Sequence, residues 1–191
     1  MLGTSPFIGA GQFGRRSLDY LSRFYNKPDR IVEIIDACWE TGVNAIQLLP
    51  EKYIIDAISM WEKKNGEIIT VISSIFRLRQ IDDLINRFEH SAMLVHASIV
   101  DYHDKDILNR FLSKIRERGL PAGIVSHTPY RTLSWIKNWE IDIDIAMIPI
   151  NKIGYMMDAD IERIGRLIRK IDCKVIAKKF LLLAEYHQKR H

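Results

Sequence analysis

Side chains that could act in catalysis or bind a ligand follow one short apolar segment after another along this chain of 191 residues. Two imidazoles, those of His96 and His127, could serve as acid and base near neutral pH. A lysine that is desolvated beside a second lysine, as Lys178 is beside Lys179, has a lowered pKa and could form a Schiff base with a carbonyl compound. The lysines and the amide of Asn151 could instead hold a phosphate or a carboxylate.

These polar residues stand at the carboxyl ends of the apolar segments, whereas the segments begin almost only with aliphatic residues, Gly or Pro. Polar side chains inside apolar strands are costly unless they are satisfied or useful, so their recurrence favours a binding site. The predicted catalytic residues are His96, His127 and Lys178. The predicted substrate-binding residues are Thr4, Ser5, Gln47, Asn151 and Lys152. Other polar residues at these ends are Gln12, Ser73, Ser74, Ser98, Asp101, Thr128 and Lys179.

Each of these residues also has a structural explanation. Gln47 could bridge neighbouring backbones, and Asp101 could cap the following helix. Because successive residues of a strand face opposite ways, only one of Lys178 and Lys179 is expected to point into a site. The histidines lack the spacing of an HxH or HExxH pair, so no metal site is expected.

The elements that must position these residues alternate regularly. Apolar runs of strand length are followed by amphipathic segments of helix length, in about seven units of roughly 25 to 30 residues each. Strands joined through helices are parallel, and apolar parallel strands are covered on both faces. The predicted strands are residues 2–8, 44–50, 67–73, 92–97, 121–126, 143–150 and 174–178. The predicted helices are residues 29–41, 53–64, 82–89, 104–118, 132–139 and 160–171.

Two architectures fit this alternation, an open doubly wound sheet and a (β/α) barrel. Gly9, Gly11 and Gly14 form a G-x-G-x-x-G pattern, but the polar and aromatic residues 15–27 separate it from the first clear helix. The alternation therefore favours a single TIM-barrel-like α/β domain over residues 1–191. It would have about seven βα units, with the eighth missing or replaced by the C-terminal segment FLLLAEYHQKR.

Composition excludes several classes of protein. A hydrophobic content of 47% excludes a disordered chain, and no apolar run approaches the roughly 18 residues of a membrane helix. The net charge is +4, but basic and acidic residues are interleaved, so no nucleic-acid partner is expected. Without a secretory signal, and with Cys38 and Cys173 isolated, a cytoplasmic protein is expected.

Several segments resemble the aldo/keto reductases in the order in which that family carries them. They are LGTSPFIGAGQFG (residues 2–14), TGVNAIQLLPEKY (41–53), LVHASIVD (94–101), IDIAMIPINKI (143–153) and KVIAKKFLLLA (174–184). The chain resembles still more closely a group of uncharacterised archaeal barrel proteins. They share the first segment, the turn H-x-P-[FY]-R-T (127–132) and P-[IV]-N-K-[IL]-G-Y (149–155). The resemblance implies a barrel fold.

The reductase resemblance also implies a nicotinamide cofactor, NADP, and a catalytic tyrosine with an aspartate, a lysine and a histidine. His96 stands at the family's histidine position, and Tyr53 lies about one residue from its tyrosine. Gln47 stands at the aspartate position and the pair Ser73–Ser74 at the lysine position, so the usual partners that tune the tyrosine are changed.

Three functional hypotheses follow. The first is an enzyme, or an enzyme relic, that binds a small carbonyl-bearing or anionic metabolite through His and Lys residues. The second is an aldo/keto-reductase-type oxidoreductase with an altered catalytic set. The third is a non-catalytic binding or assembly module, because a barrel short of one unit would expose strand edges that a second copy could cover.

Overall fold

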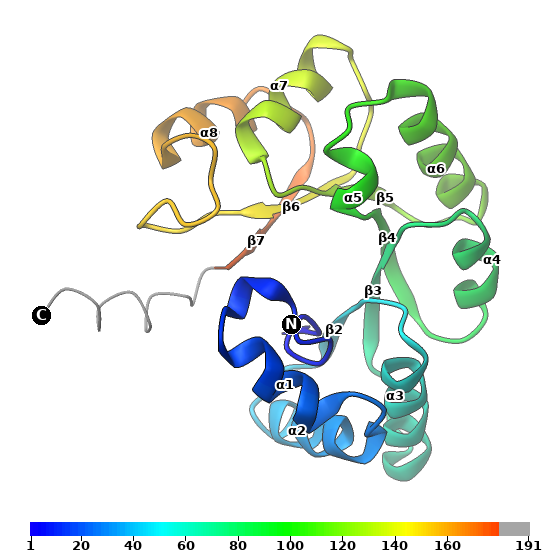
Figure 1. Cartoon of the computed structure of the whole chain (residues 1–191). Coiled ribbons are helices and arrows are strands. Elements are labelled where there is room, and N and C mark those ends of the chain that lie inside the picture. The colour runs from blue at the N-terminus through cyan, green and yellow to red at the C-terminus, as the bar shows by residue number, and fades with distance from the viewer. Residues whose placement is uncertain (180–191) are drawn as a thin grey trace, which may run out of the picture. The chain divides into compact units, whose positions relative to one another are not determined.

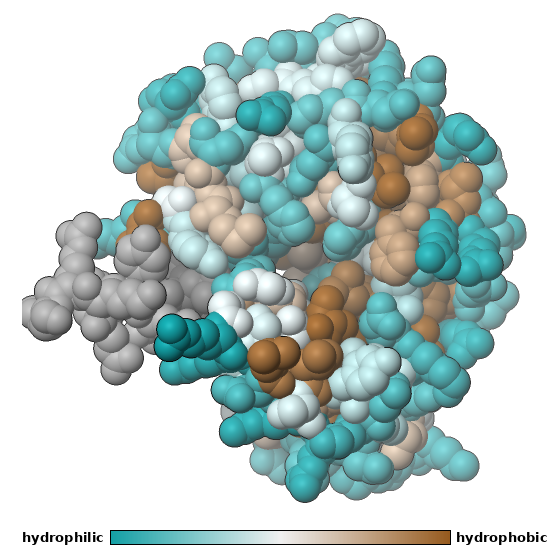
Figure 2. Space-filling view, viewed as in Figure 1, coloured by the Kyte–Doolittle hydropathy of each residue, from teal (hydrophilic) through white to brown (hydrophobic). Residues whose placement is uncertain are grey.

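The computed structural model describes residues 1–179, in which helices alternate with parallel strands (Figure 1). The chain divides into two compact units, an N-terminal unit (Met1–Ala92) and a C-terminal unit (Met93–His191). No helix among residues 1–179 combines the length and apolarity needed to cross a bilayer. The face drawn in Figure 2 is largely hydrophilic, and its hydrophobic residues lie in small patches.

The N-terminal unit places three parallel strands beside its helices. Thr70 of β3 pairs with Ala45 of β2, and Gln47 of β2 pairs with Gly3 of β1. The apolar face of α3 is fully buried at Ile54 and Ile58, and the helix ends at Gly66, which adopts the left-handed conformation with φ 70°. Its elements are β1 (Leu2–Gly3), η1 (Gly11–Phe13), α1 (Arg16–Phe24), α2 (Pro28–Glu40), β2 (Ala45–Leu48), α3 (Lys52–Asn65), β3 (Thr70–Ile75) and α4 (Arg79–Ile85).

The C-terminal unit repeats the same alternation. Asp104 and Asp160 start helices α6 and α8, because each carboxylate accepts a backbone N–H of the first turn, at 2.9 and 2.7 Å. Its elements are β4 (His90–Val95), which begins just before the unit, α5 (Ala97–Val100), α6 (Lys105–Glu117), β5 (Ala122–Val125), α7 (Pro129–Asn138), β6 (Ile145–Pro149), α8 (Ile161–Ile168) and β7 (Lys174–Lys178).

Close strand packing in this unit depends on Gly123. A Cβ atom there would lie 2.7 Å from Cδ2 of Leu94 and would collide with the carbonyl oxygen of Ile145. Gly123 pairs with Leu94 of β4 and with Ile145 of β6. All four residues of β5 are buried, as expected of a parallel strand covered on both faces.

The predicted barrel is wrong. The strands follow one another in chain order from β1 to β7, and in the described part of the chain neither β1 nor β7 has a second strand partner. A closed barrel requires two partners for every strand, so the protein has an open parallel α/β sheet. The segment expected to replace the eighth unit lies outside the described residues.

The first strand is much shorter than predicted. The amide of Phe7 donates to the carbonyl of Thr4, and that of Gly9 to the carbonyl of Pro6, so the chain turns directly after Gly3. Pro6 lacks a ladder donor, and Gly9 has a φ of 57° that few other residues adopt. The following residues, expected to be a connection, contain helix α1.

Candidate functional site

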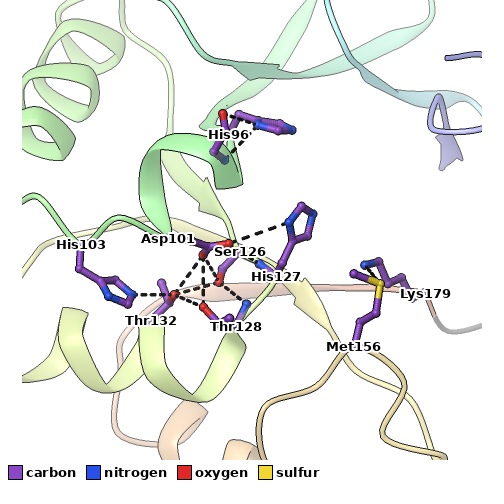
Figure 3. A network of polar contacts seen from close by, with 10 residues as sticks. His96, Asp101, His103, Ser126, His127, Thr128, Thr132, Met156 and Lys179 are labelled. Carbon is purple, nitrogen blue, oxygen red and sulfur yellow. Dashed lines mark hydrogen bonds and ion pairs between the residues drawn. The ribbon is translucent and has the colours of Figure 1, made fainter. Parts of the chain in front are cut away.

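Asp101 organises the carboxyl ends of β4 and β5 (Figure 3). It ends helix α5 directly after β4, and its carboxylate is 22% exposed. Oδ1 accepts a hydrogen bond from the hydroxyl of Ser126 at 2.6 Å and lies 3.2 Å from the hydroxyl of Thr132. Oδ2 accepts the backbone N–H of His127 at 3.0 Å. One carboxylate thus fixes the turn that carries His127.

The hydroxyl proton of Ser126 can be assigned from the lengths of its contacts. Ser126 has one hydroxyl proton, and the shorter contact, to Asp101, takes it. Its oxygen then accepts the N–H of Thr128 at 3.0 Å. Thr132 lies 2.9 Å from Ser126 and 3.1 Å from Nε2 of His103. Since Ser126 and Thr132 are fully buried, these contacts replace water completely.

The rings of His96 and His127 face one another edge to face. Their centroids are 6.4 Å apart, and the ring planes are inclined at 88°. Nδ1 of His96 accepts the backbone N–H of Ser98 at 3.1 Å, which places the proton of the neutral ring on Nε2. Nδ1 of His127 is 3.9 Å from Oδ2 of Asp101. The pair therefore combines the oriented N–H group of His96, which can donate a hydrogen bond, with the second imidazole of His127.

Burial and nearby cations keep both imidazoles neutral. Burial lowers the pKa of His96, and Lys178 lowers it further, while Asp101 acts against this. Burial lowers the pKa of His127 to about 4, with added repulsion from Lys178 and Lys179, although 44% of its side chain remains exposed. At pH 7 both rings are therefore neutral, and the ring of His127 can accept a proton.

Lys178 ends β7 opposite Pro149 of β6, and its charge acts on both histidines. Burial lowers its pKa to about 7, repulsion from Lys179 adds to this, and attraction to Asp101 opposes it. About half of the amine is therefore neutral at pH 7 and able to act as a nucleophile.

Strand alternation predicts that Lys178 and Lys179 point in opposite directions. The backbone at Lys179 departs from the extended conformation that this prediction assumes. Its φ of 63° breaks the extended conformation, and its Nζ donates to Sδ of Met156 at 2.7 Å (Figure 3). Burial lowers its pKa to about 8, and its charge also acts on His127. Both lysines thus contribute to the potential at this end of the sheet.

A cavity of about 280 Å³, open to solvent, adjoins the two histidines. Ser98 and Asp101 line it, together with His96 and His127. Tyr102 also lines it, and 84% of that residue is exposed. This volume suits a small metabolite.

The predicted site residues of β6 take other positions. Both ends of the Asn151 amide close the loop that follows β6, since Nδ2 donates to the carbonyl of Tyr155 at 2.9 Å and Oδ1 accepts its N–H at 2.8 Å. Lys152 is exposed on that loop. The amide of Asn151 therefore holds the backbone near β7.

The predicted residues of the N-terminal unit also make local contacts. The buried hydroxyl of Thr4 donates to the carbonyl of Gln47 at 2.9 Å and accepts the N–H of Leu49 at 3.1 Å. Nε2 of Gln47 donates to the hydroxyl of Ser74 at 2.9 Å. Ser5 accepts a turn hydrogen bond through its carbonyl. These contacts tie the carboxyl ends of β1, β2 and β3 together.

The sequence did not reveal the partners of Asp101. The sequence predicts Ser126 only as the last residue of a strand and Thr132 only as the first residue of a helix, and no pattern singles out His103. Polar Ser126, His127 and Thr128 directly after a wholly apolar strand were the available signal. No group of His, Cys, Asp and Glu side chains in residues 1–179 has a geometry that could hold a metal ion.

Comparisons with known proteins support the fold alone. No protein-family model and no curated protein matches the chain. The crystal structure of Gox0644 in its apo form is similar, with a TM-score of 0.59 over 80% of this chain. The two sequences are 10% identical, and the alignment spans 59% of the length of Gox0644.

Proposed function

We propose that the C-terminal unit binds a small carbonyl-bearing metabolite as an imine on Lys178, and that the chain is an enzyme of the Schiff-base class. The observation that carries this proposal is that Lys178, at the end of β7, lies close enough to His96 after β4 and His127 after β5 for its charge to act on both, beside a carboxylate fixed by Ser126 and the His127 amide. Each of these groups has a role in imine formation.

In the first step, the neutral amine of Lys178 adds to the carbonyl carbon. The adduct first carries a positive nitrogen and a negative oxygen, and Nε2–H of His96 donates a hydrogen bond to that oxygen while keeping its proton. His127 takes a proton from the nitrogen and delivers it to the oxygen, which gives the carbinolamine. The nitrogen lone pair then expels the hydroxyl group, which leaves as water with a proton from the solvent in the open cavity, and the remaining nitrogen proton returns to the solvent to give the imine. The balance is one amine and one carbonyl compound consumed, one imine and one water formed.

The charges around Lys178 also favour particular substrates. The ammonium group of Lys179 lies at the same end of the sheet, where it attracts a carboxylate or phosphate on the carbonyl compound. The cavity of about 280 Å³ beside His96 and His127 has room for such a compound. We therefore expect small oxo acids and phosphorylated aldehydes or ketones to be the best substrates.

Borohydride trapping tests the proposal. The protein is incubated at pH 7.5 with individual oxo acids and sugar phosphates and reduced, and the modified lysine is located by peptide mass spectrometry. The expected adduct lies on Lys178 and is lost in Lys178→Met. Lys174→Met is the matched control, because Lys174 begins the same strand at its opposite end, and it should retain the adduct. Absence of an adduct, or equal labelling of Lys174 and Lys178, would overturn the proposal.

The oxidoreductase alternative has less support. The hydroxyl of Tyr53 donates to the carbonyl of Phe7 at 3.1 Å, and the side chain is buried. Burial raises the pKa of Tyr53 to about 12, the opposite of what proton transfer to a carbonyl requires. Gln47, at the position of the family's aspartate, is bonded to Ser74 instead.

A further inference from the structure

A second cavity in the C-terminal unit lies between helices α7 and α8, outside the candidate site. It has a volume of about 300 Å³, and basic side chains dominate its walls. We call it the basic groove and define it by Ser134, Lys137, Asn138, Arg163, Arg166 and Lys170.

The groove is formed by facing sides of the two helices. Arg163, Arg166 and Lys170 are spaced by three and four positions, so they share one side of α8 and its continuation. Ile164 and Leu167 of the same helix are buried. The cations are therefore held on a packed helix, not on a loop.

Helix stability alone does not explain this arrangement. Lys137 and Arg166 lie in the last turns of their helices, where a cation interacts favourably with the helix dipole. Arg163 lies in the first turn of α8, where the dipole disfavours a positive charge. The helix dipole therefore does not account for an arginine at this position.

Among the described residues, no carboxylate pairs with the four cations of the groove. No acidic side chain lines the cavity, and none of the ion pairs found within residues 1–179 involves Lys137, Arg163, Arg166 or Lys170. The charge of Asp160 acts on Arg163, but its carboxylate is engaged in capping α8. Arg116 in the same unit, by contrast, pairs with both Asp142 and Asp144.

Arg163 is also oriented by an aromatic neighbour. Its guanidinium carbon lies 4.6 Å from the centroid of the Tyr130 ring. Such stacking holds the guanidinium plane while leaving N–H groups at its edge to donate to a ligand. Ser134 and Asn138 add neutral groups that can bond hydroxyls of a ligand.

We propose that the basic groove binds a small molecule bearing phosphate groups. Two guanidinium groups match phosphate oxygens in pairs, and two ammonium groups add charge, so an anion with two or more negative charges fits best. A volume of about 300 Å³ has room for one or two phosphate groups and a small organic part. This site is separate from Lys178 and does not depend on the Schiff-base proposal.

Calorimetric titration at low salt with pyrophosphate and with a sugar bisphosphate tests the proposal. We expect the double variant Arg163→Gln, Arg166→Gln to weaken binding at least about tenfold, since two charge-assisted contacts are lost. Arg169→Gln is the matched control, because this exposed arginine ends the same helix without lining the groove, and it should change affinity less than about twofold.

The arms of the titration separate the possible results. Binding of both probes with similar affinity supports recognition of the phosphate groups themselves, and tighter binding of the sugar compound supports added contacts through Ser134 and Asn138. Pyrophosphate has no carbonyl group and cannot form an imine, so a loss of pyrophosphate binding in the double variant assigns that binding to the groove and not to the imine site. The proposal is overturned if neither probe binds, or if Arg169→Gln weakens binding as much as the double variant.

Discussion

Replacing Asp101 by alanine should destabilise the C-terminal unit more than any other single carboxylate substitution near the site. The change removes the acceptor for the Ser126 hydroxyl at 2.6 Å, for the His127 N–H at 3.0 Å and for the Thr132 hydroxyl at 3.2 Å. Ser126 and Thr132 are fully buried, so their hydroxyl groups lose a charged acceptor that neutral water reaching the space would replace only in part.

The size of the effect follows from these partners. A hydrogen bond to a charged group contributes about 1.5–3 kcal/mol. Ser126 and Thr132 remain 2.9 Å apart and can still bond one another, and His127 lies at the exposed end of the cluster. We therefore count one full charge-assisted bond and a fraction of the others, which gives a loss of about 2–3 kcal/mol in the free energy of unfolding.

Asp104→Ala provides the matched comparison. Asp104 lies three residues further along and caps α6 through a single bond to the N–H of Ile107 at 2.9 Å. Loss of such a cap costs about 1 kcal/mol. Urea unfolding of both variants and the unchanged protein, followed by circular dichroism, should show the larger loss for Asp101→Ala. If Asp101→Ala costs no more than Asp104→Ala, the carboxylate does not organise this end of the sheet.

Two further predictions concern pH and strand packing. The folded protein holds His127 with a pKa of about 4, so between pH 6.5 and 4 the unfolded chain binds more protons and the free energy of unfolding falls as the pH is lowered. Urea unfolding at pH 6.5 and 4.5 should show a smaller fall for His127→Gln, and an equal fall would contradict a lowered pKa. Gly123→Ala should cost about 1–3 kcal/mol, because its Cβ would meet Leu94 and Ile145. Gly3→Ala, which meets nothing within 4 Å, should leave the melting temperature unchanged, and equal melting of the two variants would count against the packing argument.

Hydrophobic patterns in the sequence predict most directly those strands whose residues are all buried. Residues 121–126 and 143–150 contain β5 and β6, whose residues are all buried. β7 (Lys174–Lys178) also matches its prediction, although its residues are only partly buried or exposed. Helix α1 is not predicted, because its segment RSLDYLSRF is rich in polar residues and none of its residues is buried. Closure of the sheet could not be predicted, because it depends on whether distant edge strands pair and not on any local pattern.

The candidate site is likewise predictable from the sequence only in part. That polar residues cluster where strands end follows from parallel pairing, and the structure does bring His96, His127 and Lys178 to one end of the C-terminal unit. Their catalytic role stays a prediction. The contacts of Asp101 with Ser126 could not be predicted, because they depend on side-chain directions between two loops 25 positions apart.

The order of the strands also bears on how the protein folds. Within the C-terminal unit Met93 pairs with Ala122, Gly123 with Ile145, and Ile145 with Lys174, so each strand pairs with the next strand along the chain, one or two helices away. Each pairing closes a short loop at little entropic cost, and the contact order stays low for a parallel sheet. Growth can therefore proceed one strand at a time with the helices that precede it, and a substitution that weakens an inner strand should slow this growth more than one in an edge strand.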